Sequence, residues 1–135
     1  MPMPADDKLV EAALTARKNA VAPYSQFLVG AALETAEGEI FTGCNVENAT
    51  YGLTICAERV AVFKALSEGR RRFTRIAVAA DTETLTPPCG ACRQILWEFC
   101  GDIPVILANL SGNREWFQMK DLFPRAFDSS FLKEK

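Results

Sequence analysis

Two short cysteine motifs limit the folds open to this chain more than any other feature. The first reads Cys-Ala-Glu-Arg over residues 56–59, and the second reads Pro-Pro-Cys-Gly-Ala-Cys over residues 87–92. Each motif lies where a loop is expected to enter a helix, and the spacing of the last two cysteines places both thiols on one helical turn. A fold that uses the two motifs together must bring two helix N-termini face to face.

The thiols of these motifs, Cys56, Cys89 and Cys92, form a candidate ligand set for a metal ion. A helix N-terminus stabilises a thiolate through its unpaired amides and partial positive charge, and the thiolate is the form that binds zinc. Three protein ligands leave the fourth tetrahedral position of Zn²⁺ open for water, which is the pattern of a catalytic site. Glu58 follows closely enough to take a proton from that water and return it to a substrate. A Cys-x-x-Cys pair alone also occurs in redox and structural sites, so the prediction depends on the combination.

The charge of this ligand set calls for a counterion. Three thiolates and one Zn²⁺ sum to a single negative charge, which opposes ionisation of a bound water. Arg59 and Arg93 each follow a motif directly, and we expect one or both to donate hydrogen bonds to the sulfurs. Surface arginines in exposed helical turns would give the same pattern.

Two further observations concern the remaining side chains that could bind a metal. The chain contains no histidine, so any zinc must be held by thiolates and carboxylates. Cys44 and Cys100 lack a Cys-x-x-Cys partner, and we expect both to be small buried thiols.

The order of apolar runs and breakers predicts an α/β fold. The expected elements are a helix capped by Asp6 or Asp7 that ends before Pro23, a hairpin of strands at 27–33 and 39–44, a helix at 54–68, a strand at 73–80, a helix at 89–99, strands at 105–108 and 115–119, and one helical turn at 121–123. Gly69 and Gly101 are expected to end the second and third helices. Because helices separate the strands, we predict one domain, 1–135, folded as a three-layer α-β-α sandwich with a five-stranded mixed sheet.

Length, charge and hydropathy exclude several classes of protein. A chain of 135 residues with 49% hydrophobic side chains can fold around a single core. Its formal net charge of -2 gives no positive field for a phosphate backbone, so nucleic acid is not an expected partner. The basic run at 70–72, together with Arg75, is interpreted as solvated cations at the end of a helix. No membrane span or signal peptide is recognised and the five cysteines are expected to be reduced, which predicts a cytoplasmic protein.

Longer motifs point to a family. They read PYSQFLVGAAL at 23–33, GCNVENATYG at 43–52, CAER at 56–59, PPCGACRQ at 87–94 and FPRAF at 123–127. The order of Cys-x-Glu and a later Pro-Cys-x-x-Cys is the ligand signature of zinc deaminases. Over nearly its whole length the chain resembles the cytidine deaminase family, in the short homotetrameric form with three cysteine ligands.

The resemblance implies zinc-dependent hydrolysis of cytidine and 2′-deoxycytidine to uridine and 2′-deoxyuridine, with release of ammonia, in pyrimidine salvage. It implies that water activated by zinc attacks C4 of the ring, while Glu58 protonates N3 and then the departing amine. The further contacts that it implies with the substrate are the backbone of Ala57 and Cys89 against the pyrimidine, Phe27 stacked on the base, Asn45 and Glu47 on the ribose hydroxyls, and Phe127 in the pocket of a neighbouring subunit. By the residue pattern alone, these positions would equally suit a loop, a core or an interface.

Three alternatives remain at this point. A related deaminase could act on another aminopyrimidine, such as the antibiotic blasticidin S, although the NVEN segment at 45–48 favours a plain nucleoside. A zinc-stabilised interaction domain would hold the metal without catalysis. A polynucleotide deaminase is disfavoured by the net charge and by the lack of a basic groove with stacking side chains.

Overall fold

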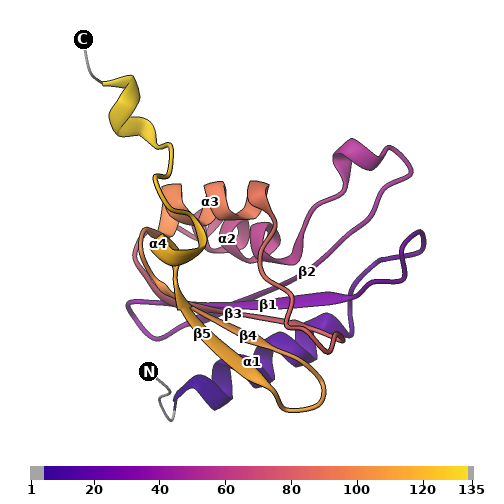
Figure 1. Cartoon of the computed structure of the whole chain (residues 1–135). Coiled ribbons are helices and arrows are strands. Elements are labelled where there is room, and N and C mark those ends of the chain that lie inside the picture. Colours follow the sequence, from indigo (N-terminus) through magenta and orange to yellow (C-terminus); the bar gives the residue numbers. More distant parts are fainter. Residues whose placement is uncertain (1–4, 134–135) are drawn as a thin grey trace.

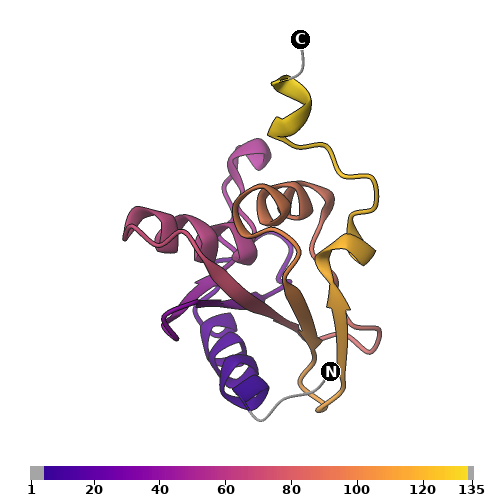
Figure 2. The same ribbon diagram turned by 90° about the vertical axis from the view of Figure 1, so that its left-hand side faces the viewer.

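The structure is a computed structural model that describes residues 5–133. In chain order its elements are α1 (Ala5–Arg17), β1 (Val29–Thr35), β2 (Ile40–Cys44), η1 (Tyr51–Leu53), α2 (Ala57–Ser67), β3 (Phe73–Ala80), α3 (Gly90–Cys100), β4 (Pro104–Ala108), β5 (Arg114–Gln118), α4 (Met119–Leu122) and η2 (Ser129–Leu132). Five strands form one sheet in the order β2-β1-β3-β4-β5. Helix α1 covers one face of this sheet, and α2 and α3 cover the other (Figures 1 and 2). The predicted three-layer α-β-α sandwich is confirmed.

The direction of the strands places two helix N-termini together. Strands β2 and β3 both pair antiparallel with β1, so they run parallel to each other. Helix α2 follows β2 and helix α3 follows β3, and both helices lie on the same face. Because parallel strands end at the same edge of a sheet, α2 and α3 begin at one edge. The pairing of β3 with β4 is also parallel, so the sheet is mixed as predicted.

Two predicted helix starts differ from the observed ones. Helix α1 begins at Ala5, so the prediction that Asp6 or Asp7 caps it was wrong, and both carboxylates lie in its first turn. Helix α2 begins at Ala57 rather than near residue 54, because Ile55 stays extended and its backbone pairs with Val46.

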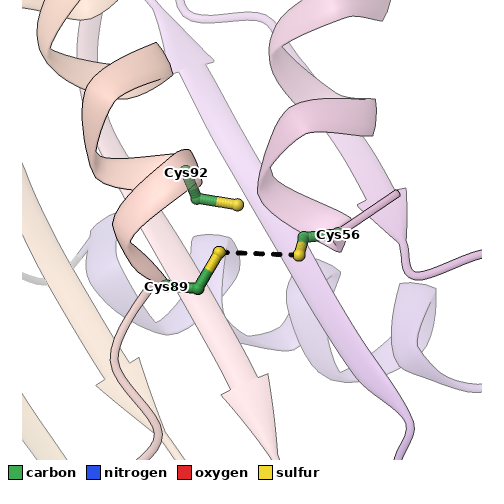
Figure 3. A group of neighbouring side chains, drawn as sticks. All are labelled: Cys56, Cys89 and Cys92. Carbon is green, nitrogen blue, oxygen red and sulfur yellow. Dashed lines mark hydrogen bonds between the residues drawn. The ribbon is translucent and has the colours of Figure 1, made fainter. Parts of the chain in front are cut away.

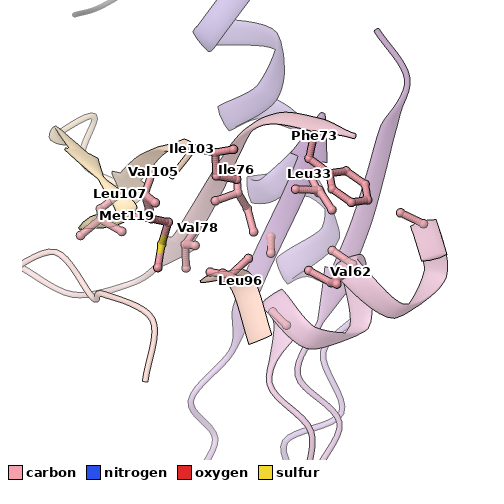
Figure 4. Packing of buried hydrophobic residues seen from close by; sticks show 14 of the residues in the cluster. Leu33, Val62, Phe73, Ile76, Val78, Leu96, Ile103, Val105, Leu107 and Met119 are labelled. Carbon is pink, nitrogen blue, oxygen red and sulfur yellow. The ribbon is translucent and has the colours of Figure 1, made fainter. Parts of the chain in front are cut away.

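Alternation along the strands divides the core between the two faces of the sheet. On the face covered by α2 and α3, the buried residues shown in Figure 4 include Leu33, Ile76, Val78, Val105 and Leu107. On the other face, the cluster beneath α1 is built from Leu9, Val10, Ala13, Ala32, Ala77, Ala79, Ile106 and Ala108. The central strands are therefore apolar on both faces. None of the helices within residues 5–133 has the length and apolar character needed to span a bilayer.

Arg75 is buried, which corrects its interpretation as a solvated cation. Its guanidinium donates two hydrogen bonds of 2.9 Å to the Glu34 carboxylate and pairs with Asp6 in the first turn of α1. The indole of Trp116 donates to the other oxygen of Asp6, at 3.0 Å. The hydrogen bonds from Arg75 hold the pKa of Glu34 below its usual value. This cluster fastens α1 to the sheet by polar contacts as well as by the apolar core.

A glycine permits the close contact between β2 and the first turn of α2. A Cβ atom added to Gly43 would lie 2.3 Å from the carbonyl oxygen of Ala57 and 2.6 Å from the amide nitrogen of Ala61. Both atoms belong to the helix backbone, which cannot move without shifting the whole first turn. Because Gly43 has no side chain, the first turn of α2 can lie directly against β2, and this contact positions Cys56 and Glu58.

We predict that Gly43→Ala destabilises the protein by about 1–3 kcal/mol, because overpacking forces the backbone of α2 away from the sheet. The free energy of unfolding in urea measures the effect. Gly52→Ala is the matched control, because a Cβ atom there would have no neighbour within 4 Å. Equal stabilities of the two variants would contradict the proposed role of Gly43.

Candidate metal centre and active site

The three predicted ligands meet at the edge of the sheet where α2 and α3 begin. Cys56 is the residue before α2, Cys89 is the residue before α3, and Cys92 lies in the first turn of α3. Their sulfur atoms point toward one another (Figure 3), and all three lie within 4.8 Å of each other. The Cys56 and Cys89 sulfurs are 3.7 Å apart. Neighbouring sulfurs of a tetrahedral zinc site, with bonds of about 2.3 Å, are separated by about 3.8 Å, so the spacing fits Zn²⁺.

The protonation of the sulfurs supports the same conclusion. The pKa of Cys56 is lowered to about 5, because its sulfur accepts hydrogen bonds from Cys92, Arg59 and Cys89. The pKa of Cys92 is raised, because its thiol is hydrogen-bonded to the Cys56 sulfur and is buried. The sulfurs thus compete for negative charge, and a divalent cation removes that competition by stabilising all three thiolates. The donor set therefore suits a zinc ion.

The two arginines that follow the motifs have different partners. Arg59 donates from Nη2 to the Cys56 sulfur at 3.4 Å, and its Nε is buried without a hydrogen-bond partner among the described residues. Arg93 instead donates from Nε to the carbonyl of Pro88 at 2.8 Å and from Nη1 to the carbonyl of Leu122 at 2.5 Å. Within the hydrogen bonds of residues 5–133, Arg59 is therefore the arginine beside the sulfurs, whereas Arg93 holds the loop before Cys89.

Glu58 lies in the first turn of α2 with only 4% of its surface exposed. Burial raises the pKa of its carboxyl to about 7. A carboxyl with this pKa exchanges a proton readily near neutral pH, as a group that both takes and returns a proton must. The chain has no histidine that could perform this task in its place.

Two cavities open beside these groups. The inner cavity, of about 160 Å³, reaches two of the three cysteines of the metal site. It is lined by Phe27, Val29, Asn45, Thr54, Ile55, Cys56, Ala57, Glu58, Thr86, Pro87 and Cys89. The outer cavity, of about 360 Å³, is lined by Tyr24, Ser25, Glu47, Tyr51 and Thr54. Thr54 belongs to both walls, so the two cavities adjoin. The inner cavity, which has room for a ring beside the sulfurs, thus continues into the more open outer cavity, where Glu47 supplies a carboxylate.

Asn45 and Glu47 organise the loop between α1 and β1 from two sides. The Asn45 amide donates to the carbonyl of Phe27 at 2.7 Å and accepts from the amide of Val29 at 2.9 Å. One oxygen of Glu47 accepts from the amides of Tyr24 and Ser25, at 3.0 and 3.1 Å.

Phe127 is the one predicted substrate contact that lines neither cavity of its own chain. Its ring is half exposed and stacks on Phe131, with ring centroids 5.8 Å apart. Side chains of α3 hold this segment: Gln94 donates to the carbonyl of Phe127 at 2.8 Å, and the indole of Trp97 donates to Asp128 at 3.1 Å. The segment projects away from the layers in Figure 1.

The two other cysteines lie outside the ligand cluster found among the described residues. Both are half-buried, Cys44 at the end of β2 and Cys100 at the end of α3. Burial raises the pKa of Cys100 to about 12, so this thiol stays protonated.

Sequence reasoning missed several residues of the cavities. Ser25, Tyr24 and Tyr51 line the outer cavity, although all three lie in motifs that carry the family resemblance. Thr86 reaches the inner cavity from a loop before α3 that has no regular structure. No periodic pattern in that loop could have predicted which of its side chains faces inward.

The fold, the three convergent sulfurs and the buried carboxyl in the wall of the same cavity together define the class of zinc-dependent hydrolytic enzymes. Comparisons with known proteins give the family. Residues 3–108 match the family model described as "Cytidine and deoxycytidylate deaminase zinc-binding region". The chain belongs to this deaminase family.

Similar proteins agree with this assignment. A cytidine deaminase from Halalkalibacterium halodurans is 50% identical over 127 residues, which cover 93% of this chain and 96% of that protein. A cytidine deaminase from Sporosarcina psychrophila is also 50% identical over 127 residues, with 93% of each chain covered. The crystal structure of a cytidine deaminase from Burkholderia pseudomallei matches with a TM-score of 0.87 and 50% identity, over 90% of this chain and 98% of that one.

We predict that Arg59→Met weakens zinc binding about 10- to 100-fold, because it removes the guanidinium that donates to the Cys56 sulfur. Competition with a chelator of known zinc affinity measures the change. Arg93→Met is the matched comparison, because its hydrogen bonds go to backbone carbonyls, and its zinc affinity should stay closer to that of the wild type. The reverse order of the two variants would show that the charge of the sulfurs is balanced elsewhere.

Proposed function

We propose that the protein catalyses the zinc-dependent hydrolytic deamination of cytidine and 2′-deoxycytidine to uridine and 2′-deoxyuridine, with release of ammonia. The observation that carries the proposal is the buried Glu58 carboxyl beside three convergent sulfurs, in the wall of a cavity of ring size. The names of the relatives support the substrate, since those of 50% identity are cytidine deaminases. These names do not favour the alternative function, which is deamination of another aminopyrimidine such as blasticidin S.

The chemistry divides between the metal and the chain. Zinc, when bound to Cys56, Cys89 and Cys92, supplies a Lewis acid that makes a water acidic enough to act as a nucleophile at neutral pH. Glu58 takes a first proton from the attacking water and delivers it to N3 as the C4–O bond forms. It then takes the remaining proton from that oxygen and gives it to the amine, so that the C4–N bond breaks, ammonia leaves and the C4 carbonyl forms. Burial of the Glu58 carboxyl keeps its pKa in the range where both transfers are possible.

We assign the inner cavity to the base and the outer cavity to the sugar. In this pose the ring lies against Phe27, and the backbone of Ala57 and Cys89 meets its polar edge; all three residues line the inner cavity. Asn45 lies in the inner wall and Glu47 in the outer wall, and Thr54 belongs to both walls. A carboxylate has about four acceptor sites, so Glu47 can accept from a sugar hydroxyl in addition to its backbone donors.

We further propose that the substrate is a free nucleoside and that the protein acts in the cytoplasm, in pyrimidine salvage. The net charge of -2 supports this view, as does the absence of lysine and arginine from the described residues that line either cavity. A phosphate backbone would find no counterion there. Conversion of single-stranded DNA with free cytidine left untouched would overturn the nucleoside assignment.

A homotetramer is proposed on the basis of the family resemblance, and exposed aromatic side chains support contacts between subunits. Tyr24 and Tyr51 form an edge-to-face pair with ring centroids 5.9 Å apart, beside the outer cavity, and both are more than half exposed. Phe127 and Phe131 form a second exposed pair. Large exposed aromatics of this kind are enriched at protein interfaces. In the tetramer, Phe127 is proposed to line the cavity of a neighbouring subunit.

We predict that Glu58→Gln lowers kcat for cytidine by about 10³-fold or more, because the amide cannot transfer the proton. Ammonia release measures turnover, and zinc content and thermal unfolding measured on the same sample show that metal and fold persist. Glu11→Gln, on the exposed face of α1, is the control for the loss of one carboxylate. Full activity of Glu58→Gln, with zinc bound, would remove Glu58 from the proposed mechanism.

We predict that Phe127→Ala and Glu58→Gln complement each other when their subunits are mixed. Each variant alone has a defect in every cavity, but a hybrid contains cavities with Glu58 from one subunit and Phe127 from its neighbour. The mixture should therefore deaminate cytidine faster than either variant, and the native mass should correspond to four chains. A monomeric mass with full activity would overturn both the tetramer and the shared role of Phe127.

A further inference from the structure

The hydroxyl of Ser25 joins two groups that face the cavities. It donates a short hydrogen bond to Oε2 of Glu47 and accepts a hydrogen bond of 3.0 Å from the amide of Phe27. Ser25 also lines the outer cavity, and its side chain is exposed there. The Ser25 hydroxyl thus contacts two groups. One is the Glu47 carboxylate, which is assigned to the sugar, and the other is the backbone amide of Phe27, whose ring is assigned to the base.

The two oxygens of Glu47 are held in different ways. Oε1 accepts from the backbone amides of Tyr24 and Ser25, at 3.0 and 3.1 Å. Oε2 accepts from the Ser25 hydroxyl, which is a rotatable side-chain group. A carboxylate anchored through one oxygen alone can still rotate about that anchor, so the Ser25 hydroxyl fixes the plane of the carboxylate. This plane decides where the remaining acceptor sites of Glu47 point.

The ionisation of Glu47 fits such a role. The hydrogen bond from the Ser25 hydroxyl, with smaller effects from the two amides, lowers the pKa of Glu47. The side chain therefore stays a carboxylate at neutral pH. An anionic acceptor forms stronger hydrogen bonds with hydroxyl donors than a neutral one.

The loop also has hydrogen bonds that do not involve the Ser25 hydroxyl. The Asn45 side chain holds Phe27 and Val29 through their backbone groups, and the amide of Gln26 donates to the carbonyl of Ala22 at 2.9 Å. We therefore expect Ser25→Ala to leave these contacts in place. Besides its hydrogen bond with the amide of Phe27, the Ser25 hydroxyl is placed to adjust the geometry of the cavity through Glu47.

We propose that Ser25 is a positioning residue for the sugar side of the substrate, which acts by fixing the orientation of the Glu47 carboxylate toward a ribose hydroxyl. The inference rests on the proposed contact between Glu47 and the sugar. It extends that contact to a residue that does not itself need to touch the reacting atoms.

The test compares Ser25→Ala with two substrates that differ in their sugar hydroxyls. With cytidine, Ser25→Ala should lower kcat/KM about tenfold, mostly through KM, because the hydrogen bond to a charged group that orients Glu47 is lost. With 2′,3′-dideoxycytidine, which lacks both ring hydroxyls, the same variant should change kcat/KM much less. A general loosening of the structure would affect both substrates alike.

Two further variants make the test specific. Ser25→Thr keeps a hydroxyl and should retain most of the activity with cytidine. Thr74→Val removes another exposed hydroxyl that donates to a carboxylate, that of Glu34 at 2.6 Å, at the start of β3 and far along the strand from the site. This control should leave kcat/KM unchanged for both substrates.

A double-mutant cycle with Glu47→Ala decides whether Ser25 acts through Glu47. The proposal requires that Ser25→Ala has little further effect in the Glu47→Ala background. Wild-type kinetics of Ser25→Ala with cytidine, equal losses with both substrates, or a full effect in the Glu47→Ala background would each overturn it. If Glu47→Ala alone has no effect, the sugar contact is wrong and this inference falls with it, while deamination of cytidine by the wild type would still support the proposed reaction.

Discussion

The site depends on two helix N-termini that meet at one edge of the sheet. Since β2 and β3 run parallel on either side of β1, the helices that follow them begin side by side. Cys56 and Cys89 each precede one of these helices, and Cys92 adds a third sulfur from the first turn of α3. Two positive helix ends directed at one point can stabilise several thiolates, and a tetrahedral zinc ion held by three protein ligands would keep its fourth position for water.

The negative charge of the three thiolates then determines the roles of the neighbouring Arg59 and Glu58. A ligand set made only of thiolates carries more negative charge than one with neutral imidazoles, and Arg59 opposes that charge with a direct hydrogen bond to sulfur. Glu58 would add a further negative charge, but its burial keeps the carboxyl partly protonated. The same burial that makes the carboxyl costly to ionise gives it the pKa that proton transfer needs.

Features with a local signal could be predicted from the sequence. The apolar runs of the strands, the cysteine spacing and the glycines that end helices all depend on a few adjacent residues, and Gly69 and Gly101 indeed have φ angles of +86° and +76° at the ends of α2 and α3. Arg75 could not be placed this way. Its partners, Asp6 and Glu34, are remote in the sequence, and its charged neighbours in the chain suggested an exposed run.

The same limit applies to the site. The cysteine ligands follow from spacing, whereas the partners of Arg93 depend on where the carbonyl of Leu122 lies after the sheet has formed. Ser25 and Glu47 meet only because the loop after α1 folds back on the end of β2. Contacts of this kind are decided by tertiary structure, and no periodicity in the chain encodes them.

An all-sulfur ligand set also determines which other metals can enter the site. Hard cations such as Mg²⁺ and Ca²⁺ bind oxygen ligands, so their abundance in a cell does not threaten a centre built from Cys56, Cys89 and Cys92. Cu(I) is different, because soft thiolates suit it at least as well as they suit zinc. Correct loading of this enzyme therefore depends less on its own selectivity than on how strictly its host withholds free copper.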